Sequence, residues 1–246
     1  MTLWEKMLKD IEKEFETKEN FLKHKTISRT IAPNDSAYPH AITKKFLNHV
    51  KGNSNCVDNI LPKVLESSVG GLVLTDGYSQ GTAQHCFYLN VMLEHLKLEI
   101  TDFDHITDVG GGYGNFYRMA KKLGYQGTFD IVDFPIMHKI QEYYLTELEL
   151  DLPNFIEMEK INSKGKSILF GLHSINEMPM SDRDFLEKKY RLYDNIMILY
   201  NDHFDGIDNF EYFSKLKDRL SDTFSVSIID HELKGNAKFL IGSKVV

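Results

Sequence analysis

Short apolar runs and amphipathic stretches alternate along the chain from about residue 101 to its end. The apolar runs predict strands at 106–109, 128–132, 155–158, 167–172, 195–200, 224–229 and 238–245. Stretches with apolar residues three and four apart predict helices at 115–123, 135–148, 181–192 and 209–220. This alternation predicts an α/β fold with a mostly parallel sheet of seven strands, covered by helices on both faces. The short connection before the last strand predicts an antiparallel hairpin at one edge.

The first hundred residues lack this alternation, and their pattern indicates helices. An apolar stripe predicts an amphipathic helix over residues 1–25, with its apolar face formed by Trp4, Met7, Leu8, Ile11 and Phe15. The stripe either packs on the body of the protein, which we favour, or makes a homodimer contact through the N-terminal helices. We therefore predict a helical N-terminal cap over residues 1–100 and an α/β domain over residues 101–246.

Composition narrows the class of protein. The 246 residues include 36 acidic and 29 basic ones, for a net charge of −7. This balance argues against a nucleic-acid partner, because such binding depends on clustered Lys and Arg. The apolar runs are too short to span a membrane, the N-terminal residues form no signal core, and two cysteines make no disulfide framework. We expect a cytoplasmic protein that acts on a small molecule or a glycan, with no membrane partner.

A glycine-rich turn follows the strand predicted at 106–109. Its glycines are Gly110, Gly112 and Gly114, and such a turn brings bare backbone close to a ligand. The nicotinamide pattern fails because Asn115 stands where its third glycine is required. With Asp108 two places before the first glycine, the segment resembles motif I of the class I methyltransferases, whose cofactor is S-adenosylmethionine (SAM). The resemblance implies a Rossmann-like fold and a SAM site at these residues.

An acidic residue, Asp133, ends the next predicted strand, where doubly wound folds bind ribose hydroxyls. The alternative is that Asp133 only caps the helix after it. Asp133-Phe134-Pro135 also resembles a segment of the small-molecule O-methyltransferases, which implies that Phe134 lies near the adenine; otherwise Phe134 is a core aromatic. Tyr78 and Gln80, in the turn at 75–82, are candidates for the carboxylate of SAM, unless that turn is merely polar.

Candidate catalytic residues follow the strands predicted at 167–172 and 195–200. His173 can act as a general base at neutral pH, and Glu177 lies four residues on. The plant-type phenolic O-methyltransferases place their base in a similar context, and an acid after the next strand orients it. Asp202 is the nearest counterpart of that acid, although His203 competes for the role. The alternative for each is a structural side chain.

Residues 75–205 most resemble the sugar O-methyltransferases of bacteria and viruses. The resemblance implies transfer of a methyl group from SAM to a sugar hydroxyl, with His173 as base. One alternative is an O-methyltransferase whose acceptor is a phenol or another small natural product. The other is a SAM-binding module without catalytic activity. Magnesium held by Glu177 and Asp202 would be a different way to activate the hydroxyl, and we do not favour it. Enzymes that methylate nucleic-acid bases carry an Asn/Asp-Pro-Pro segment after the corresponding strand. This chain has His173-Ser-Ile-Asn176 after the strand predicted at 167–172 instead.

Overall fold

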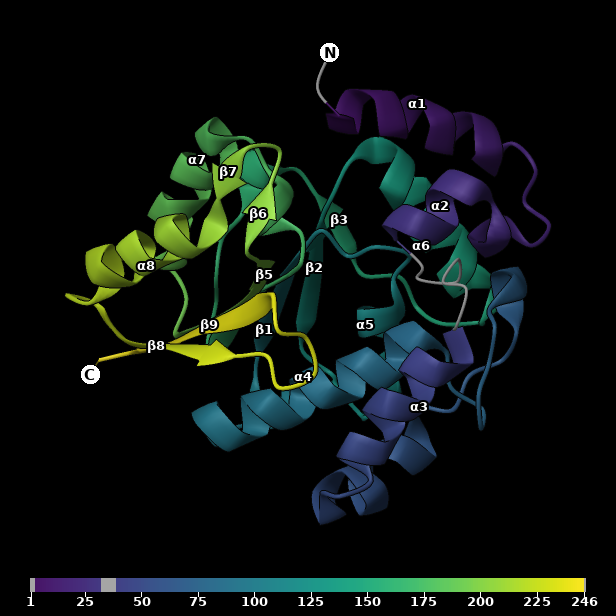
Figure 1. The fold of residues 1–246 in the computed structure, drawn as a ribbon, viewed down its shortest axis with the longest axis horizontal. Helices are drawn as coiled ribbons and strands as arrows, with labels where there is room; N and C mark the ends of the chain where they lie inside the picture. The colour runs from purple at the N-terminus through teal and green to yellow at the C-terminus, as the bar shows by residue number, and fades with distance from the viewer. Residues whose placement is uncertain (1–2, 32–38, 246) are drawn as a thin grey trace. The chain divides into compact units, whose positions relative to one another are not determined.

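The structure, a computed structural model, describes residues 3–31 and 39–245. It contains one sheet of seven strands in the order β3-β2-β1-β4-β5-β9-β8 (Figure 1). Their bounds are β1 His105–Val109, β2 Thr128–Val132, β3 Asn154–Ile156, β4 Ser167–Leu172, β5 Asn195–Asn201, β8 Phe224–Asp230 and β9 Ala237–Lys244. Strands β1 to β5 pair in parallel, and β9 pairs antiparallel with both β5 and β8. The predicted mostly parallel sheet with an antiparallel edge is confirmed.

The strand order reverses at β1, because β2 and β4 lie on its two sides. In open α/β sheets, ligands bind outside the carboxyl ends of the strands at such a switch point. All five residues of β1 are buried, as expected for a strand covered on both faces. The fold therefore places the end of β1, where the glycine-rich turn begins, at the position in which doubly wound folds bind ligands.

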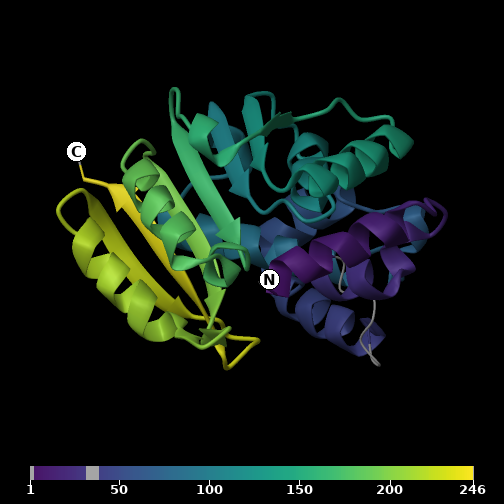
Figure 2. The same ribbon diagram turned by 90° about the horizontal axis from the view of Figure 1, so that it is seen from above.

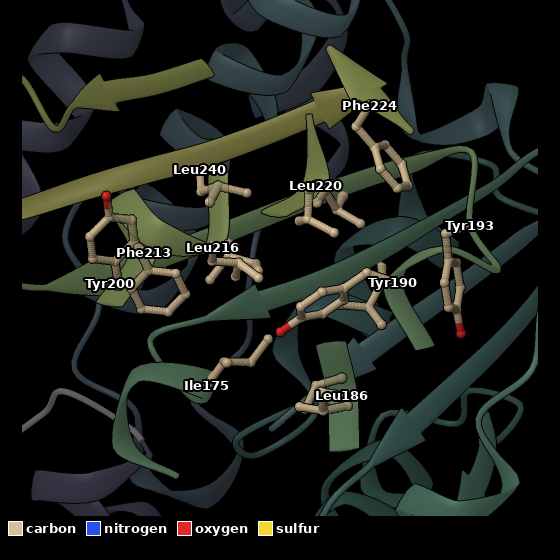
Figure 3. Packing of buried hydrophobic residues seen from close by; sticks show 14 of the residues in the cluster. Ile175, Leu186, Tyr190, Tyr193, Tyr200, Phe213, Leu216, Leu220, Phe224 and Leu240 are labelled. Atoms are coloured by element: carbon tan, nitrogen blue, oxygen red, sulfur yellow. The ribbon is translucent and has the colours of Figure 1, made fainter. Parts of the chain in front are cut away.

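Helices α7 (Met180–Tyr190) and α8 (Asn209–Leu220) pack on one face of this sheet (Figure 2). Figure 3 shows Leu186 of α7 and Leu216 of α8 in a buried cluster. Ile196 and Ile198 of β5 belong to the same cluster. The alternation along β5 explains this, since residues two apart point to the same face. A two-stranded hairpin, β6 (His203–Phe204) with β7 (Ile207–Asp208), leads into α8 and has no counterpart in the sequence prediction.

Residue contacts divide the chain into two compact units. Unit 1 comprises Met1–Val91, Gly111–Tyr125 and Phe134–Leu152, and unit 2 comprises Met92–Gly110, Gln126–Asp133 and Pro153–Val246. The whole seven-stranded sheet belongs to unit 2, whereas the helices that follow β1 and β2 in the chain belong to unit 1. The boundary near residue 100 that the sequence suggests stays a prediction.

Unit 1 is helical in the part that the structure describes. Its helices are α1 Leu3–Phe15, α2 Lys25–Thr30, α3 Pro39–Val50, α5 Asn115–Lys122 and α6 Pro135–Glu147, while α4 Gln80–Leu96 begins in it and runs into unit 2. The short turns are η1 Phe21–Lys23, η2 Cys56–Ile60, η3 Leu61–Lys63 and η4 Val69–Gly71 in unit 1, and η5 Ile100–Asp102, η6 Met158–Lys160 and η7 Ile175–Glu177 in unit 2.

The helix predicted over residues 1–25 is shorter in the structure. It ends at Phe15, and Asn20 then adopts a left-handed conformation that a helix does not continue through. Ile11 and Phe15 are buried, and the Phe15 ring packs edge-on against Phe21 and Tyr143 of the same unit. This end of the stripe packs on the protein itself, and the homodimer contact stays a prediction.

The α8 packing gives a first test of the fold. Leu216→Ala should lower the free energy of unfolding by about 2–5 kcal/mol, because it leaves a cavity at a fully buried position. Leu192→Ala is the control, since that leucine is 45% exposed and should cost about 0.5 kcal/mol or less. Urea unfolding of both variants measures the difference, and equal costs would contradict the packing of α8 on the sheet.

Candidate functional site

The carboxyl ends of β1, β2, β4, β5 and β8 lie along one edge of the sheet in unit 2. Because β8 and β5 both pair antiparallel with β9, β8 runs in the same direction as the parallel strands. The chain segments that leave this edge carry Gly110, Asp133, His173 and Asp202, together with the turn at 231–236. Four of the predicted site residues are therefore brought to the same edge.

Gly110 lies against Ser174, which follows β4. Gly110 has a φ of +79°, and a Cβ atom there would lie 2.3 Å from the Cβ of Ser174. The amide of Gly110 donates to the carbonyl of Val132 at 2.8 Å, and the Ser174 hydroxyl donates to the carbonyl of Val109. The two strand ends thus meet so closely that only glycine fits at position 110.

Asp108, the acid of the glycine motif, is buried at 2% exposure. Burial, with a smaller contribution from the charge of Asp133, raises the pKa of the Asp108 carboxyl to about 7. Ionisation of such a buried carboxyl is costly without a partner, and a bound cation would stabilise the ionised form. This environment is suited to a ligand that carries an ammonium group.

The raised pKa has a consequence for stability. Between about pH 4 and pH 7 the folded state holds the Asp108 proton and the unfolded state does not, so this group lowers stability as the pH rises. Asp108→Asn should therefore stabilise the protein at pH 8, and its advantage should shrink on acidification by up to about 1.4 kcal/mol per pH unit.

Urea unfolding of the wild type and Asp108→Asn from pH 5 to pH 8 tests this. Asp218→Asn, at an exposed carboxyl of α8, corrects for the removal of one charge. An advantage of Asp108→Asn that stays constant across this range, or grows toward low pH, would contradict the assigned pKa.

His173 directly follows β4. Its amide donates to the carbonyl of Leu199 on β5 at 2.9 Å, and its φ of +69° is in the left-handed region, which non-glycine residues adopt at a cost of about 1–3 kcal/mol. The Nε2 atom of His173 lies 3.3 Å from the Nζ atom of Lys234. Burial lowers the pKa of Lys234 to about 8. Such backbone strain next to a shifted pKa is typical of functional sites.

Glu177, at the end of η7, is half-buried, and burial raises the pKa of its carboxyl to about 7. Arg183 of α7 holds the segment on both sides of it. The buried guanidinium of Arg183 donates to the carbonyls of Asn176 at 2.5 Å and Met178 at 2.9 Å. It also donates to the side chain of Asn209 at 2.8 Å. Arg183 therefore fixes the backbone that carries Glu177.

Asp202 and His203 contact each other in the segment that follows β5. The His203 amide donates to Oδ1 of Asp202 at 2.9 Å, and Nδ1 of the imidazole lies 3.7 Å from Oδ2. The side chain of His203 is 65% exposed. An exposed imidazole in a hairpin is poorly placed to exclude water from a reaction, so of the two histidines His173 is the better candidate base.

In unit 1, the rest of the glycine turn has the conformation that the motif requires. Gly112 and Gly114 have φ values of +58° and +93°, and Gly114 stands at the N-cap of α5. Gln141 of α6 is fully buried and donates from Nε2 to the carbonyl of Gly112 at 3.0 Å. A hydrogen bond from a neighbouring helix therefore holds the turn in place.

The turn at 75–82 is also held within unit 1. The hydroxyl of Tyr78 donates to the carbonyl of Leu61 at 3.0 Å, so this polar atom is used in packing the unit. Gln80, the first residue of α4, differs: it is 8% exposed, and its Oε1 has no hydrogen-bond partner among the residues that the structure describes. A buried amide oxygen without a donor is a candidate ligand contact.

Phe134 takes the N-cap position of α6 and is 44% exposed. The alternative that Phe134 is a core aromatic is therefore wrong. Its ring lies 6.0 Å from that of Trp4. Phe134 rather than Asp133 occupies the N-cap position, and the two alternatives for Asp133, ribose binding and helix capping, stay predictions.

Two further features lie outside these residues. A surface groove of about 660 Å³ runs between α7 and α8. Some of its charged side chains form ion pairs: Arg219 lies 2.7 Å from Glu187, and Lys215 lies 2.5 Å from Glu211. None of the predicted site residues lines it. Within residues 3–31 and 39–245, no group of three or more His, Cys, Asp or Glu side chains is arranged to hold a metal ion.

Lys234 and Arg183 are the residues that the sequence did not suggest. Lys234 stands in a hairpin turn, where a lysine is normally solvated, and Arg183 is one of many charged residues on an amphipathic helix. Only the contacts that each makes with the segment after β4 distinguish them.

Solved structures share this fold at low sequence identity. The chain matches the PH0226 protein from Pyrococcus horikoshii OT3 with a TM-score of 0.51 and 14% identity, over 70% of this chain and 94% of that one. It matches a candidate RNA methyltransferase from Pyrococcus horikoshii with a TM-score of 0.50 and 16% identity, over 83% and 96% of the two chains. A chain of the Pnkp1/Rnl/Hen1 RNA repair complex matches with a TM-score of 0.52 and 15% identity, over 70% of this chain and 42% of that one.

These matches, together with the strand order, show that the chain has the Rossmann-like fold of the class I methyltransferases. No family model and no curated protein matches the sequence. Among the described helices, none combines the length and the apolar character that a membrane span requires.

Proposed function

We propose that this chain is a SAM-dependent O-methyltransferase that acts on a hydroxyl of a sugar or glycan, with His173 as general base. The observation that carries the proposal is the set of side chains at the carboxyl edge of the sheet. Burial moves the pKa values of Asp108 and Glu177 to about 7 and that of Lys234 to about 8, and His173 contacts the lysine. Several pKa values shifted toward neutral pH, at the point where the strand order reverses, are typical of an active site.

The chain's own residues fit SAM. Asp108 supplies a buried carboxyl for the ammonium group, and the turn from Gly110 to Gly114 leaves backbone atoms open to the methionine part. Asp133 is assigned to the ribose hydroxyls and the exposed ring of Phe134 to the adenine. Gln80 offers its unpartnered Oε1 to a donor of the ligand, while Tyr78 keeps only its ring for such a contact.

SAM, when bound, supplies a methyl group on a positively charged sulfur. Held by Asp108 and the glycine turn, SAM would supply this methyl group to the acceptor oxygen as an electrophile, and its sulfur would keep the electron pair of the carbon–sulfur bond. His173 removes the proton of the acceptor hydroxyl, which is otherwise a weak nucleophile. Glu177 and Asp202 stay predictions as groups that bind the acceptor or orient the base. Alignment of the reactants provides much of the acceleration.

Transfer of tritiated methyl from SAM tests the proposal, with methyl glycosides and nucleotide sugars, simple phenols, and a short RNA as acceptors. We expect label in the sugars. His173→Asn should lower the turnover by about 100-fold or more, because asparagine accepts the left-handed backbone but is not a base. His95→Asn, at an exposed histidine of α4, is the control and should leave the rate unchanged.

Other outcomes assign other functions. Label only in the phenols would favour a natural-product acceptor, and label only in RNA would overturn the expectation of no nucleic-acid partner. The RNA arm is included because two of the proteins with this fold are described by RNA chemistry. SAM binding without transfer to any acceptor would favour a module without activity, and absence of SAM binding in calorimetry would overturn the proposal.

A further inference from the structure

Lys234 is fixed next to His173 by the hairpin that closes the sheet. It lies in the turn between β8 and β9, where its amide donates to the carbonyl of His231 at 3.0 Å and its carbonyl accepts from Ala237 at 3.2 Å. These bonds tie the turn at both sides of the lysine. The side chain reaches 3.3 Å from Nε2 of His173, although the two residues are 61 positions apart in the sequence.

The surroundings of Lys234 favour a neutral amine above about pH 8, well below the pH at which a solvated lysine loses its proton. Its pKa is lowered to about 8, and burial is the cause. No carboxylate forms an ion pair with it among the residues that the structure describes. Other titratable groups at this sheet edge are Asp108 at the end of β1, Asp133 after β2, Glu177 on η7, Asp202 and His203 after β5, and His231 and Glu232 in the same turn.

Two cationic groups at 3.3 Å would repel each other, so His173 and Lys234 do not both hold a full positive charge in this arrangement. When the amine is neutral, it can take up a proton from the imidazole beside it, because an aliphatic amine is ordinarily a stronger base than an imidazole. A proton taken up by the imidazole of His173 can therefore be passed on to the amine of Lys234.

We propose that Lys234 and His173 form one catalytic pair, in which Lys234 is the final acceptor of the proton from the substrate hydroxyl. This inference rests on the proposed function. The proton leaves the acceptor oxygen for the imidazole of His173, and a proton passes from Nε2 of that imidazole to Nζ of Lys234. The lysine becomes an ammonium, the imidazole returns to its neutral form, and solvent removes the proton after product release.

A first measurement needs no acceptor. Side-chain NMR of the protein with labelled lysine follows each ammonium group through a pH titration, and Lys238 in β9 is the matched reference. Lys234 should titrate near pH 8, well below Lys238, and its titration should move in His173→Asn. A Lys234 that titrates together with Lys238, or does not respond to His173→Asn, would overturn the pair.

The second measurement is turnover at saturating SAM with the best acceptor. Lys234→Met and Lys234→Arg should each lower kcat by about 100-fold, because neither can take up a proton, whereas SAM affinity should change less than twofold. Lys238→Met, which loses an ion pair with Asp230 and a cation–π contact with Phe210, should keep the wild-type rate. Wild-type turnover in Lys234→Arg would show that charge rather than proton uptake matters, and would overturn the inference.

The two failures are distinguishable. A wild-type chain that methylates no acceptor overturns the proposed function, and the catalytic role of the pair with it, even if Lys234 titrates near pH 8. An active wild type whose Lys234 variants keep their rate overturns the pair alone and leaves His173 as a base without a partner.

Discussion

Gly110→Ala should destabilise the protein by about 2–5 kcal/mol and abolish SAM binding. Two costs add, since alanine is strained at a φ of +79° and its Cβ would lie 2.3 Å from that of Ser174. Relief of the clash must separate the end of β1 from the end of β4, and this displaces the glycine turn. Urea unfolding and calorimetric titration with SAM measure the two effects.

Gly206→Ala is a closely matched control for the backbone term. Gly206 has a φ of +80°, and a Cβ there would meet nothing within 4 Å, so the strain is present without the clash. We expect a cost of about 1–2 kcal/mol and unchanged SAM affinity. Adding Ser174→Gly to Gly110→Ala should recover part of the lost stability. Equal costs for Gly110→Ala and Gly206→Ala would contradict the close contact of the two strand ends.

Glu66→Ala should lower the free energy of unfolding by about 3–5 kcal/mol, because it leaves a buried guanidinium without its carboxylate. Nη2 of Arg118 lies 3.7 Å from Oε1 of Glu66, and these side chains are 2% and 1% exposed. Glu66 also accepts hydrogen bonds from the amide of Ser79 at 2.6 Å and from its hydroxyl at 3.0 Å. The variant should therefore loosen the turn that precedes Gln80 as well.

A double-mutant cycle checks this interpretation. Glu66→Ala combined with Arg118→Met should cost less than the sum of the single changes, since no charge is then left buried. Glu211→Ala, which breaks an exposed pair with Lys215, is the control and should cost about 0.5 kcal/mol or less. Additive costs for Glu66 and Arg118 would show that the two side chains do not act as a pair.

The sheet could be predicted because its signals are local. Each strand is a run of apolar residues whose neighbours in the sequence set its limits, and β2 occurs at the predicted residues 128–132. The β6–β7 hairpin could not be predicted, since two-residue strands carry no periodicity. The helix predicted over residues 1–25 is too long, because the helix ends with the apolar stripe at Phe15 and Asn20 then adopts a left-handed conformation.

The site could be predicted only in part, for a similar reason. Gly110 and His173 could be named as candidate site residues because glycine turns and strand ends have recognisable positions in the sequence. The depth at which Asp108 is buried, and with it the pKa of about 7, depends on everything packed around that side chain. The exposure of the Phe134 side chain likewise excluded one of its two predicted roles, that of a core aromatic.

The sequence by itself determined the order of strands and helices, the glycine turn and the acid before it, because each of these is written in residues that are neighbours in the chain. The tertiary structure alone decided that Lys234 meets His173, that Ser174 excludes any side chain at Gly110, and that Arg183 holds the backbone around Glu177. These contacts join segments from different strands and helices, and only the folded sheet brings such segments within hydrogen-bonding distance.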